Sequence, residues 1–118
     1  MRSLPPIDRE CFFISPIGDE GTETRKRSDD VLQRIVKKAA ERLNLEAVRG
    51  DQIHQPGVIT EQVIYHATEA RAAVADISDS NPNVIYELGI RAAVPKPVIL
   101  IIERGSTAVP FNIQGLRK

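Results

Sequence analysis

The fold that we predict is decided by the stretch DISDSNPNVIYELGIRAAVPKPVILII, from Asp76 to Ile102. A short apolar run at 73–75 precedes it, and a longer apolar run at 98–102 closes it. Between them Asn81 can cap a helix, and Pro82 suits the first helical position, where no backbone N–H is needed. Two later prolines end that helix and restart the chain as a strand. The stretch therefore predicts a strand, a helix and a second buried strand, connected as a right-handed βαβ unit.

Two further apolar runs, at 11–14 and 45–48, have the length of strands. The first is apolar on both faces, as a central strand of a parallel sheet should be. Because strands alternate with helical patterns, we predict an α/β protein with a flavodoxin-like three-layer sandwich, in which helices cover both sides of a parallel sheet. The expected strand order is 2-1-3-4. Phe111–Ile113 is a candidate for a fifth short strand.

Two helices are expected outside the βαβ unit. Ser28 can cap the first, which Asn44 ends, and the charged residues 19–27 before it are expected to form a loop. The second is expected at 58–70, after a polar loop at 49–57. The apolar positions that we expect to face inward are Val31, Leu32, Ile35, Val36, Ala39, Ala40 and Leu43 in the first helix, Ile59, Val63, Ile64 and Ala67 in the second, and Val84, Ile85, Leu88 and Ala92 in the helix of the βαβ unit.

The chain has 118 residues, which suits one domain with one core. We expect residues 1–10, which are polar and contain proline, to be a flexible leader, and residues 11–118 to form a single domain. Little apolar sequence follows residue 102, so this domain is expected to be truncated at its C-terminal edge. Two alternatives remain open for that edge: a fused or paired second domain, or a partner that covers it.

Charge and composition narrow the classes of function. The formal net charge is zero, which indicates neither a nucleic-acid-binding surface nor a membrane-binding patch. No apolar run has the length that crossing a bilayer requires, and no signal peptide opens the chain. The single cysteine, Cys11, excludes an intrachain disulfide and fits a buried thiol in a cytoplasmic protein. No metal-ligand spacing is present, so we expect no metal and no bound cofactor.

Polar residues gather where an open parallel sheet would bind a ligand, beyond the carboxyl ends of its strands. Asp76 ends one predicted strand, and Asn83 and Glu87 share one face of the helix that follows. The loop after the first strand is expected opposite them, since the strand order reverses between the first and third strands. Gly89 disfavours a helix by roughly 1 kcal/mol, which suggests that a neighbouring element or a ligand comes close there. The candidate substrate-binding residues are Ser15, Pro16, Ile17, Gly18, Asp19, Arg25, Asp51, Ser78, Asn81 and Asn83.

The motif NPNVIYELG, followed by KPVILI and combined with FFISPIGDEG near the N-terminus, resembles the nucleoside 2-deoxyribosyltransferase family. It also resembles the related TIR-like domains that cleave nicotinamide from NAD. The resemblance spans roughly residues 11–113, and NPNVIYELG is its most specific part. In both groups a glutamate at the -EL- position attacks or stabilises the anomeric carbon of a ribosyl group, which implies that role for Glu87. Some transferases carry a carboxylate where this chain has Asn81, a difference that favours cleavage over transfer.

The resemblance therefore implies an enzyme that cleaves the N-glycosidic bond of a nucleotide or of NAD, with NAD as substrate rather than cofactor. Glu87 would be the catalytic carboxylate, and Asp76 would contact the leaving base or a sugar hydroxyl. For a neutral base, a protonated Asp76 or His54 would supply a proton. Two alternatives remain open: base exchange on 2′-deoxynucleosides, and a nucleotide-sensing or interaction module without turnover. TIR-like domains often assemble, which implies a homo-oligomer.

The candidate residues also have purely structural interpretations. Glu87 and Arg91 are four residues apart and could form a surface ion pair worth roughly a few tenths of a kcal/mol. Asp76 could cap the loop that follows it. The charge run 25–27 could meet a substrate phosphate, because arginine matches phosphate geometry, or it could be solvated. These interpretations are distinguished by where the side chains lie.

Overall fold

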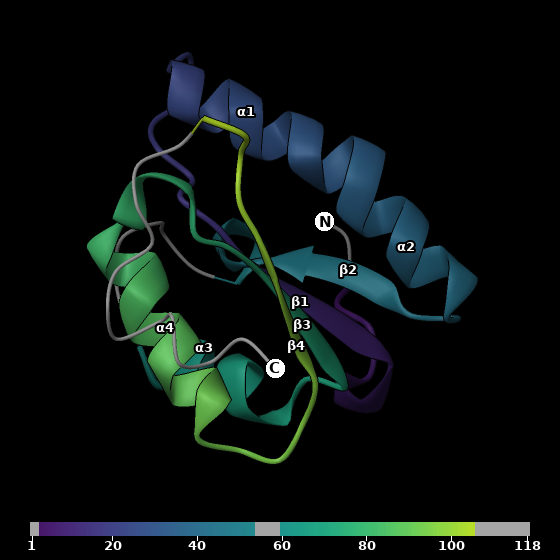
Figure 1. The fold of residues 1–118 in the computed structure, drawn as a ribbon. Helices are drawn as coiled ribbons and strands as arrows, with labels where there is room; N and C mark the ends of the chain where they lie inside the picture. The colour runs from purple at the N-terminus through teal and green to yellow at the C-terminus, as the bar shows by residue number, and fades with distance from the viewer. Residues whose placement is uncertain (1–2, 54–59, 106–118) are drawn as a thin grey trace.

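The computed structural model describes residues 3–53 and 60–105. Their strands form one parallel sheet in the order β2-β1-β3-β4, as predicted (Figure 1). The strands are β1 (Glu10–Ile14), β2 (Glu46–Arg49), β3 (Ala72–Asp76) and β4 (Val98–Ile101). The candidate fifth strand, Phe111–Ile113, lies outside the described residues. The chain is therefore an α/β protein with the flavodoxin-like strand order.

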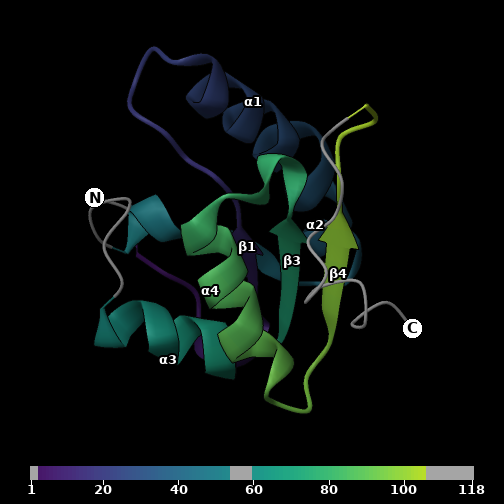
Figure 2. The same ribbon diagram turned by 60° about the vertical axis from the view of Figure 1, so that its left-hand side comes forward.

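Helices cover both faces of this sheet (Figure 2). One face is covered by α1 (Glu23–Val31), a π-helical turn η2 (Leu32–Val36) and α2 (Lys37–Arg42), which follow one another without a break. The other face is covered by α3 (Glu61–Glu69) and α4 (Pro82–Ala92). Three short 3₁₀ helices occupy connections: η1 (Ile7–Arg9), η3 (Gly50–Gln52) and η4 (Ser78–Ser80). None of the described helices combines the length and the apolar character that crossing a bilayer would require.

The first strand begins one residue earlier than predicted. Glu10, which the sequence places in the leader, opens β1 and is fully buried. Its Oε2 lies 2.7 Å from Nδ1 of His66 on α3, and this contact offsets the cost of burying a carboxylate. The other oxygen, Oε1, has no hydrogen-bond partner among the described residues. Glu10 thus ties the start of the central strand to α3.

The first helix also begins earlier than predicted. Thr22 is its N-cap, because the Thr22 hydroxyl accepts a hydrogen bond from Arg25 N over 3.2 Å. The same hydroxyl donates to the carbonyl of Asp19 over 2.6 Å. Ser28, the predicted cap, lies inside α1 and is fully buried. Residues 23–27 therefore belong to the first turns of α1 rather than to a loop, and their charged sequence has no apolar pattern that could reveal a helix.

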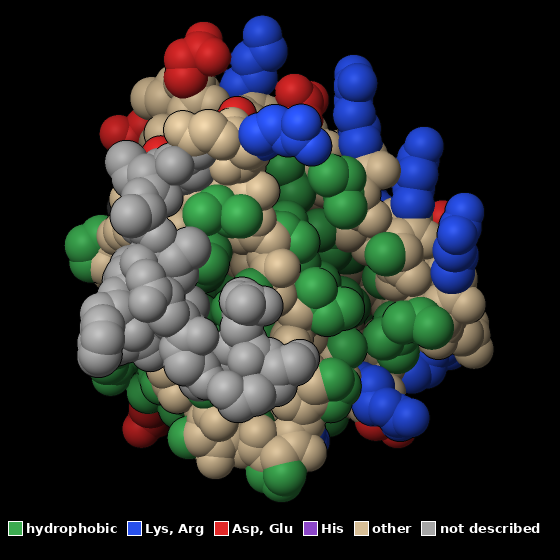
Figure 3. Space-filling model, viewed as in Figure 1, with side chains coloured by type: hydrophobic (Ala, Val, Ile, Leu, Met, Phe, Trp, Pro, Cys, Tyr) green, Lys and Arg blue, Asp and Glu red, His purple; other side chains and the backbone are tan. Residues whose placement is uncertain are grey.

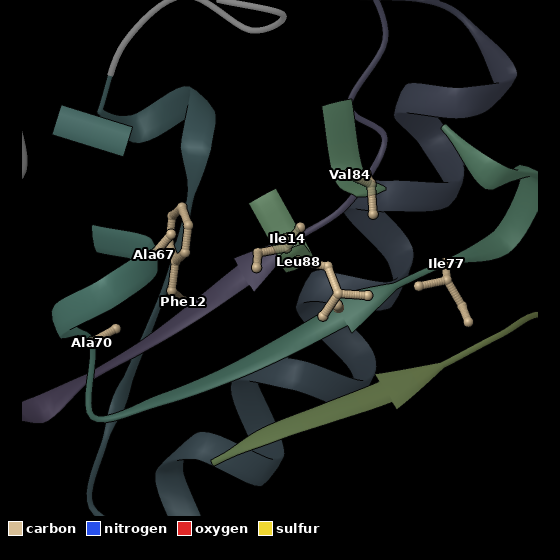
Figure 4. Packing of buried hydrophobic residues seen from close by; sticks show 8 residues of the cluster. Phe12, Ile14, Ala67, Ala70, Ile77, Val84 and Leu88 are labelled. Carbon is tan, nitrogen blue, oxygen red and sulfur yellow. The ribbon is translucent and has the colours of Figure 1, made fainter. Parts of the chain in front are cut away.

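Each face of the sheet has its own apolar core, since side chains alternate along a strand. The core under α3 and α4 contains Phe12, Ile14, Ala67, Ala70, Ala75, Ile77, Val84 and Leu88 (Figure 4). The core under α1, η2 and α2 contains Cys11, Phe13, Leu32, Val36, Ala40 and Ala47. Both faces of β1 are thus apolar, as predicted for a central strand.

Some predicted inward positions are exposed instead: Ile35, Ala39, Leu43, Ile64 and Ala92. Ile35 lies in η2, where the wider π-helical turn interrupts the 3.6-residue period on which the prediction rests. Leu43 follows the last residue of α2 and so lies beyond the helical stripe. Ile59 lies outside the described residues.

The fourth strand is only partly covered, although the sequence predicts a buried strand there. The side chains of Ile99 and Ile102 are 60% and 43% exposed. Within residues 3–53 and 60–105, no strand pairs with the outer side of β4. Figure 3 shows hydrophobic side chains gathered beside β4 and the helix that runs from α1 to α2, whose outer side carries Lys and Arg side chains. Ile35, 54% exposed, adds to this apolar surface.

Candidate active site

A pocket of about 270 Å³ lies at the carboxyl edge of the sheet. Its walls come from the segments that follow β1, β2 and β3, which Figure 2 shows on the same side of the molecule as the start of α4. This is the edge at which open parallel sheets bind ligands. The lining residues are Phe13, Ser15, Pro16, Ile17, Gly18, Asp19, Gly50, Asn81, Asn83, Val84 and Glu87. The pocket thus contains eight predicted site residues: the five of the 15–19 loop together with Asn81, Asn83 and Glu87.

The helix α4 positions the polar residues of one wall. As predicted, Asn81 caps this helix: its side-chain oxygen accepts hydrogen bonds from Asn83 N over 2.9 Å and from Val84 N over 3.2 Å. Pro82 occupies the first helical position, where its missing N–H costs nothing. Glu87 lies one turn further along, above the fully buried Val84. A locally encoded cap therefore fixes where the Glu87 carboxylate enters the pocket.

The carboxyl group of Glu87 is partly buried. No hydrogen-bond donor or cation of the described residues is bound to it. Burial, which disfavours the charged form, raises the pKa of Glu87 to about 7. Near neutral pH both the ionised and the protonated forms are therefore populated, which suits a group that exchanges charge during a reaction.

The opposite wall is the loop that leaves β1. Gly18 has φ = +70°, and a Cβ there would lie 2.9 Å from Thr22 Oγ1, so this position requires glycine. The tight turn keeps the loop against the start of α1. Ser15 and Pro16 are buried where the strand ends, whereas Gly18 and Asp19 are exposed. The pocket therefore has a rigid base and an open rim on this side.

A network of buried polar side chains lies behind Ser15. The Ser15 hydroxyl is 2.7 Å from that of Ser28, which accepts a hydrogen bond from Arg49 Nη1 over 2.9 Å. The Arg49 guanidinium also bonds to Asp51, over 2.7 and 3.0 Å, and to Asp29 over 2.8 Å. The sequence singled out neither Ser28 nor Arg49 as a site residue, because the contacts that link Arg49 to Ser28 and Ser28 to Ser15 span 21 and 13 residues of the chain.

Arg25 and Asp51, both predicted to bind substrate, belong to this network rather than to the pocket wall. Arg25 lies 3.3 Å from Asp29 and 3.5 Å from Asp51. Burial opposes ionisation of Asp51, but hydrogen bonds and charge from Arg49, with a contribution from Arg25, outweigh it and hold the pKa of Asp51 below its ordinary value. Asp51 is therefore a fixed negative partner for the two arginines.

Asp76 lies outside the pocket, contrary to the prediction that it shares a cleft with Glu87. It is fully buried, and its carboxylate accepts hydrogen bonds from Arg27 Nη1 over 2.7 Å and from Ser78 N over 3.1 Å. Because side chains alternate along β3, Asp76 faces α1, as Val74 does, rather than α4. The interpretation as a loop cap fits these contacts, since Asp76 bonds the backbone two residues on.

Ser78, another predicted substrate-binding residue, is likewise buried in this second network. Its hydroxyl accepts hydrogen bonds from Arg27 Nη2 over 2.8 Å and from Glu103 N over 2.7 Å. The third guanidinium nitrogen of Arg27, Nε, lies 3.2 Å from the Glu103 carboxylate. Each guanidinium nitrogen of Arg27 is thus engaged in joining α1 to the ends of β3 and β4, and none is left for a substrate phosphate.

On α4, the surroundings of Arg91 and Gly89 differ from those that the sequence predicts. Arg91 does not pair with Glu87: it is fully buried and donates to the carbonyls of Ala70, Pro97 and Ala67. Gly89 is exposed, and a Cβ there would meet nothing within 4 Å in the part of the chain described. No neighbouring element of residues 3–53 or 60–105 therefore accounts for this glycine. His54, the candidate acid, lies outside the described residues.

Comparisons with known proteins add no assignment: no protein-family model matches the chain, and no curated protein matches it. Within the described residues, no group of His, Cys, Asp or Glu side chains is arranged to hold a metal ion. The pocket and the residues that line it are therefore the features of the molecule that indicate a function.

Proposed function

We propose that the protein cleaves the N-glycosidic bond of a nucleotide or of NAD and that Glu87 is the catalytic carboxylate. The observation that carries this proposal is the Glu87 carboxylate in the wall of the sheet-edge pocket, which has no partner among the described residues and whose pKa burial raises to about 7. Perturbed carboxylates in such pockets are often catalytic. The resemblance of the NPNVIYELG motif supports the same role.

The chemistry requires a negative group next to the anomeric carbon. When the C1′–N bond breaks, its electron pair leaves with the base, and positive charge develops on the sugar. An ionised Glu87 would stabilise that charge or attack C1′ to form a ribosyl ester. Water then supplies the oxygen that ends on C1′, and its proton passes to solvent. The products are the free base and a sugar with a hydroxyl at C1′.

The nature of the leaving group follows from which acids reach the pocket. Nicotinamide leaves a cationic N-ribosyl group as a neutral molecule, so it needs no proton from the enzyme. A neutral base such as adenine is helped by protonation, and of the two candidate acids the one that lies within the described residues, Asp76, is held by Arg27 away from the pocket. A donor with a cationic base, such as NAD, is therefore favoured over a donor with a neutral base.

The direct test is release of base by the purified protein. The wild type is incubated with NAD, with deoxynucleosides and with deoxynucleotides, and free nicotinamide or nucleobase is measured by chromatography. Glu87→Gln keeps the shape but removes the charge, and loss of one preorganised electrostatic contact typically lowers the rate by about 10²–10³. Glu41→Gln, on the exposed side of α2, is the matched control and should leave the rate unchanged.

The same assay separates the alternatives. Base exchange would appear as a new nucleoside when a second free base is added. Equal rates of base release in the wild type and Glu87→Gln would exclude Glu87 as the catalytic group. If the wild type released no base from any donor, a nucleotide-sensing or interaction module would become the better explanation.

A further inference from the structure

We propose that Ser15 donates a hydrogen bond to a hydroxyl oxygen of the substrate's ribose, and that Ser28 and Arg49 are positioning residues that fix Ser15 as a donor. This inference rests on the proposed function, because it concerns how the same pocket recognises the ribosyl group. It is carried by the chain of hydrogen bonds from Arg49 through Ser28 to Ser15.

The direction of the hydrogen bonds follows from Arg49. A guanidinium carries only donors, so the Ser28 oxygen must accept from Arg49 Nη1. Ser28 is fully buried, and among the described residues its side chain has no partner other than Arg49 and Ser15. A buried hydroxyl hydrogen needs an acceptor. The Ser28 hydrogen is therefore directed to Ser15 Oγ, 2.7 Å away.

Ser15 Oγ then accepts a hydrogen bond from Ser28, so the hydroxyl hydrogen of Ser15 needs a different acceptor. Within the described chain the acceptor for it is the carbonyl of Pro16 at 3.4 Å, which is long for a hydroxyl donor. Ser15 also lines the pocket, together with Glu87. A group bound in the pocket that carries an acceptor oxygen would offer a better partner. Ser15 is thus a hydrogen-bond donor aimed at the ligand.

The network behind Ser15 keeps this orientation fixed. Arg49 is almost completely buried and is held by Asp51 on one side and Asp29 on the other. Three charged groups are thus grouped behind Ser15, a residue that lines the pocket. Because each link is short and the partners are anchored on β2, η3 and α1, the Ser28 side chain cannot change its rotamer without breaking the charge-assisted bond from Arg49.

The carboxylates that line the pocket indicate which chemical group of the ligand contacts Ser15. Asp19 and Glu87 line the same pocket as Ser15, and their carboxylates are hydrogen-bond acceptors when ionised. A group that lies between them and Ser15 should both donate to a carboxylate and accept from a hydroxyl. A sugar hydroxyl does both, whereas a phosphate offers acceptors alone and would be repelled by the carboxylates. The vicinal 2′- and 3′-hydroxyls of a ribose therefore fit this wall.

The test pairs variants with substrates that lack one hydroxyl. The rate of nicotinamide release is measured for NAD and for its forms that lack the 2′- or the 3′-hydroxyl of the nicotinamide ribose. For each protein we compare kcat/KM for NAD with kcat/KM for each deoxy donor. For one of the two deoxy donors this ratio is expected to be about 10-fold larger in the wild type than in Ser15→Ala, since one hydrogen bond is worth about a factor of ten. Intrinsic reactivity differences between donors cancel, because each donor is compared across variants.

Ser28→Ala isolates the positioning role, because it leaves the Ser15 hydroxyl in place. This variant is expected to raise KM about 3-fold without lowering kcat and to weaken the discrimination between NAD and the same deoxy donor. A purely structural role for Ser28 would lower the melting temperature without changing that discrimination. Thr68→Ala, which removes a hydroxyl bonded to its own helix α3, is the control and should change neither.

Four other results would overturn the role of Ser15, the proposed reaction, or both. If the penalty for each deoxy donor is the same in wild type and Ser15→Ala, the role of Ser15 is refuted while the function of Glu87 stands. If wild type binds NAD without releasing nicotinamide, the proposed reaction fails, and the same comparison is made on Kd by calorimetry. If wild type binds none of the three compounds, both proposals fall. If inorganic phosphate competes with NAD and Ser15→Ala abolishes this competition, the bound group is a phosphate and the hydroxyl assignment is wrong.

Discussion

Arg91 Nη1 lies 2.7 Å from the carbonyl oxygen of Ala70 and donates a hydrogen bond to it. The same guanidinium reaches the carbonyl of Ala67 over 3.3 Å and, through Nη2, that of Pro97 over 2.8 Å. The last carbonyls of a helix lack intrahelical partners, so a cation is favourable at the C-terminal end of α3. Arg91 thus connects α4, α3 and the residue that leads into β4.

Arg91→Ala should destabilise the fold. The change removes three charge-assisted hydrogen bonds, two of them to carbonyls of the buried residues Ala67 and Ala70, so we expect the free energy of unfolding to fall by about 3 kcal/mol. Urea denaturation measures the difference. Arg34→Ala, at an exposed position of η2, is the control, and surface changes of this kind usually stay within about 0.5 kcal/mol. Similar losses in the two variants would contradict the assigned contacts.

Glu87→Gln should stabilise the protein in a pH-dependent way. Burial raises the pKa of Glu87 from 4.5 to about 7, so the folded protein holds a proton that the unfolded chain has already lost across this window. The free energy of unfolding of the wild type therefore falls as the pH rises from 4.5 through 7. Glutamine does not ionise and avoids this loss. We expect the variant to match the wild type near pH 4.5 and to exceed it by on the order of 1–3 kcal/mol at pH 8.

Denaturation curves of both proteins at the two pH values test this expectation, and Glu41→Gln controls for a general effect of removing one negative charge. A difference that is the same at both pH values would mean that Glu87 is not desolvated. The measurement is independent of catalysis, because it needs no substrate.

Gly89→Ala should raise stability by about 1 kcal/mol, the difference in helix propensity between the two residues. The new methyl group meets no atom of the described chain within 4 Å. Gly18→Ala is the opposite case, because φ is +70° and Thr22 Oγ1 would lie 2.9 Å from the new Cβ. The melting temperature should therefore rise in Gly89→Ala and fall in Gly18→Ala. A Gly89→Ala variant that gained stability but lost binding of NAD would indicate that a ligand approaches this turn of α4.

The exposed fourth strand leads us to predict self-association. Edge strands with apolar surface recruit partners, and Ile99 on β4 is 60% exposed. Sedimentation at rising concentration should show a dimer or larger assembly, and Ile99→Lys should shift the protein towards the monomer. A wild type that stays monomeric at high concentration would refute the prediction.

The sequence predicted those features that depend on neighbouring residues. Asn81 and Pro82 specify the start of α4 by local hydrogen-bond chemistry, and the apolar runs specify the strands. The strand order was expected from the alternation of strands with helices, which is typical of the flavodoxin-like arrangement. The start of α1 was missed because the Thr22 cap is followed by a charged stretch without an apolar stripe. The sequence predicted that Asp76 ends β3, but it did not predict on which face of the sheet the Asp76 side chain lies. Both faces of β3 are packed, so the pattern of its neighbours does not show which way Asp76 points.

The polar networks could not be predicted for a different reason. Ser28 contacts Ser15 and Arg49, which are 13 and 21 residues away in the chain, and Arg27 contacts Asp76, 49 residues away. No spacing rule connects such residues, since their contact depends on how the helices are laid on the sheet. The pocket wall was therefore largely found from the sequence, whereas the groups that orient it were not.

The buried thiol of Cys11 gives the central strand a built-in chemical reporter. Burial, reinforced by the charge of Glu10, raises the pKa of Cys11 to about 11, so the thiolate that alkylating reagents attack is scarce in the native protein. The thiol becomes reactive when β1 separates from its neighbours, and there is no second cysteine to obscure the signal. The rate at which a thiol reagent modifies the native protein therefore measures how often the middle of the sheet opens, without any added label.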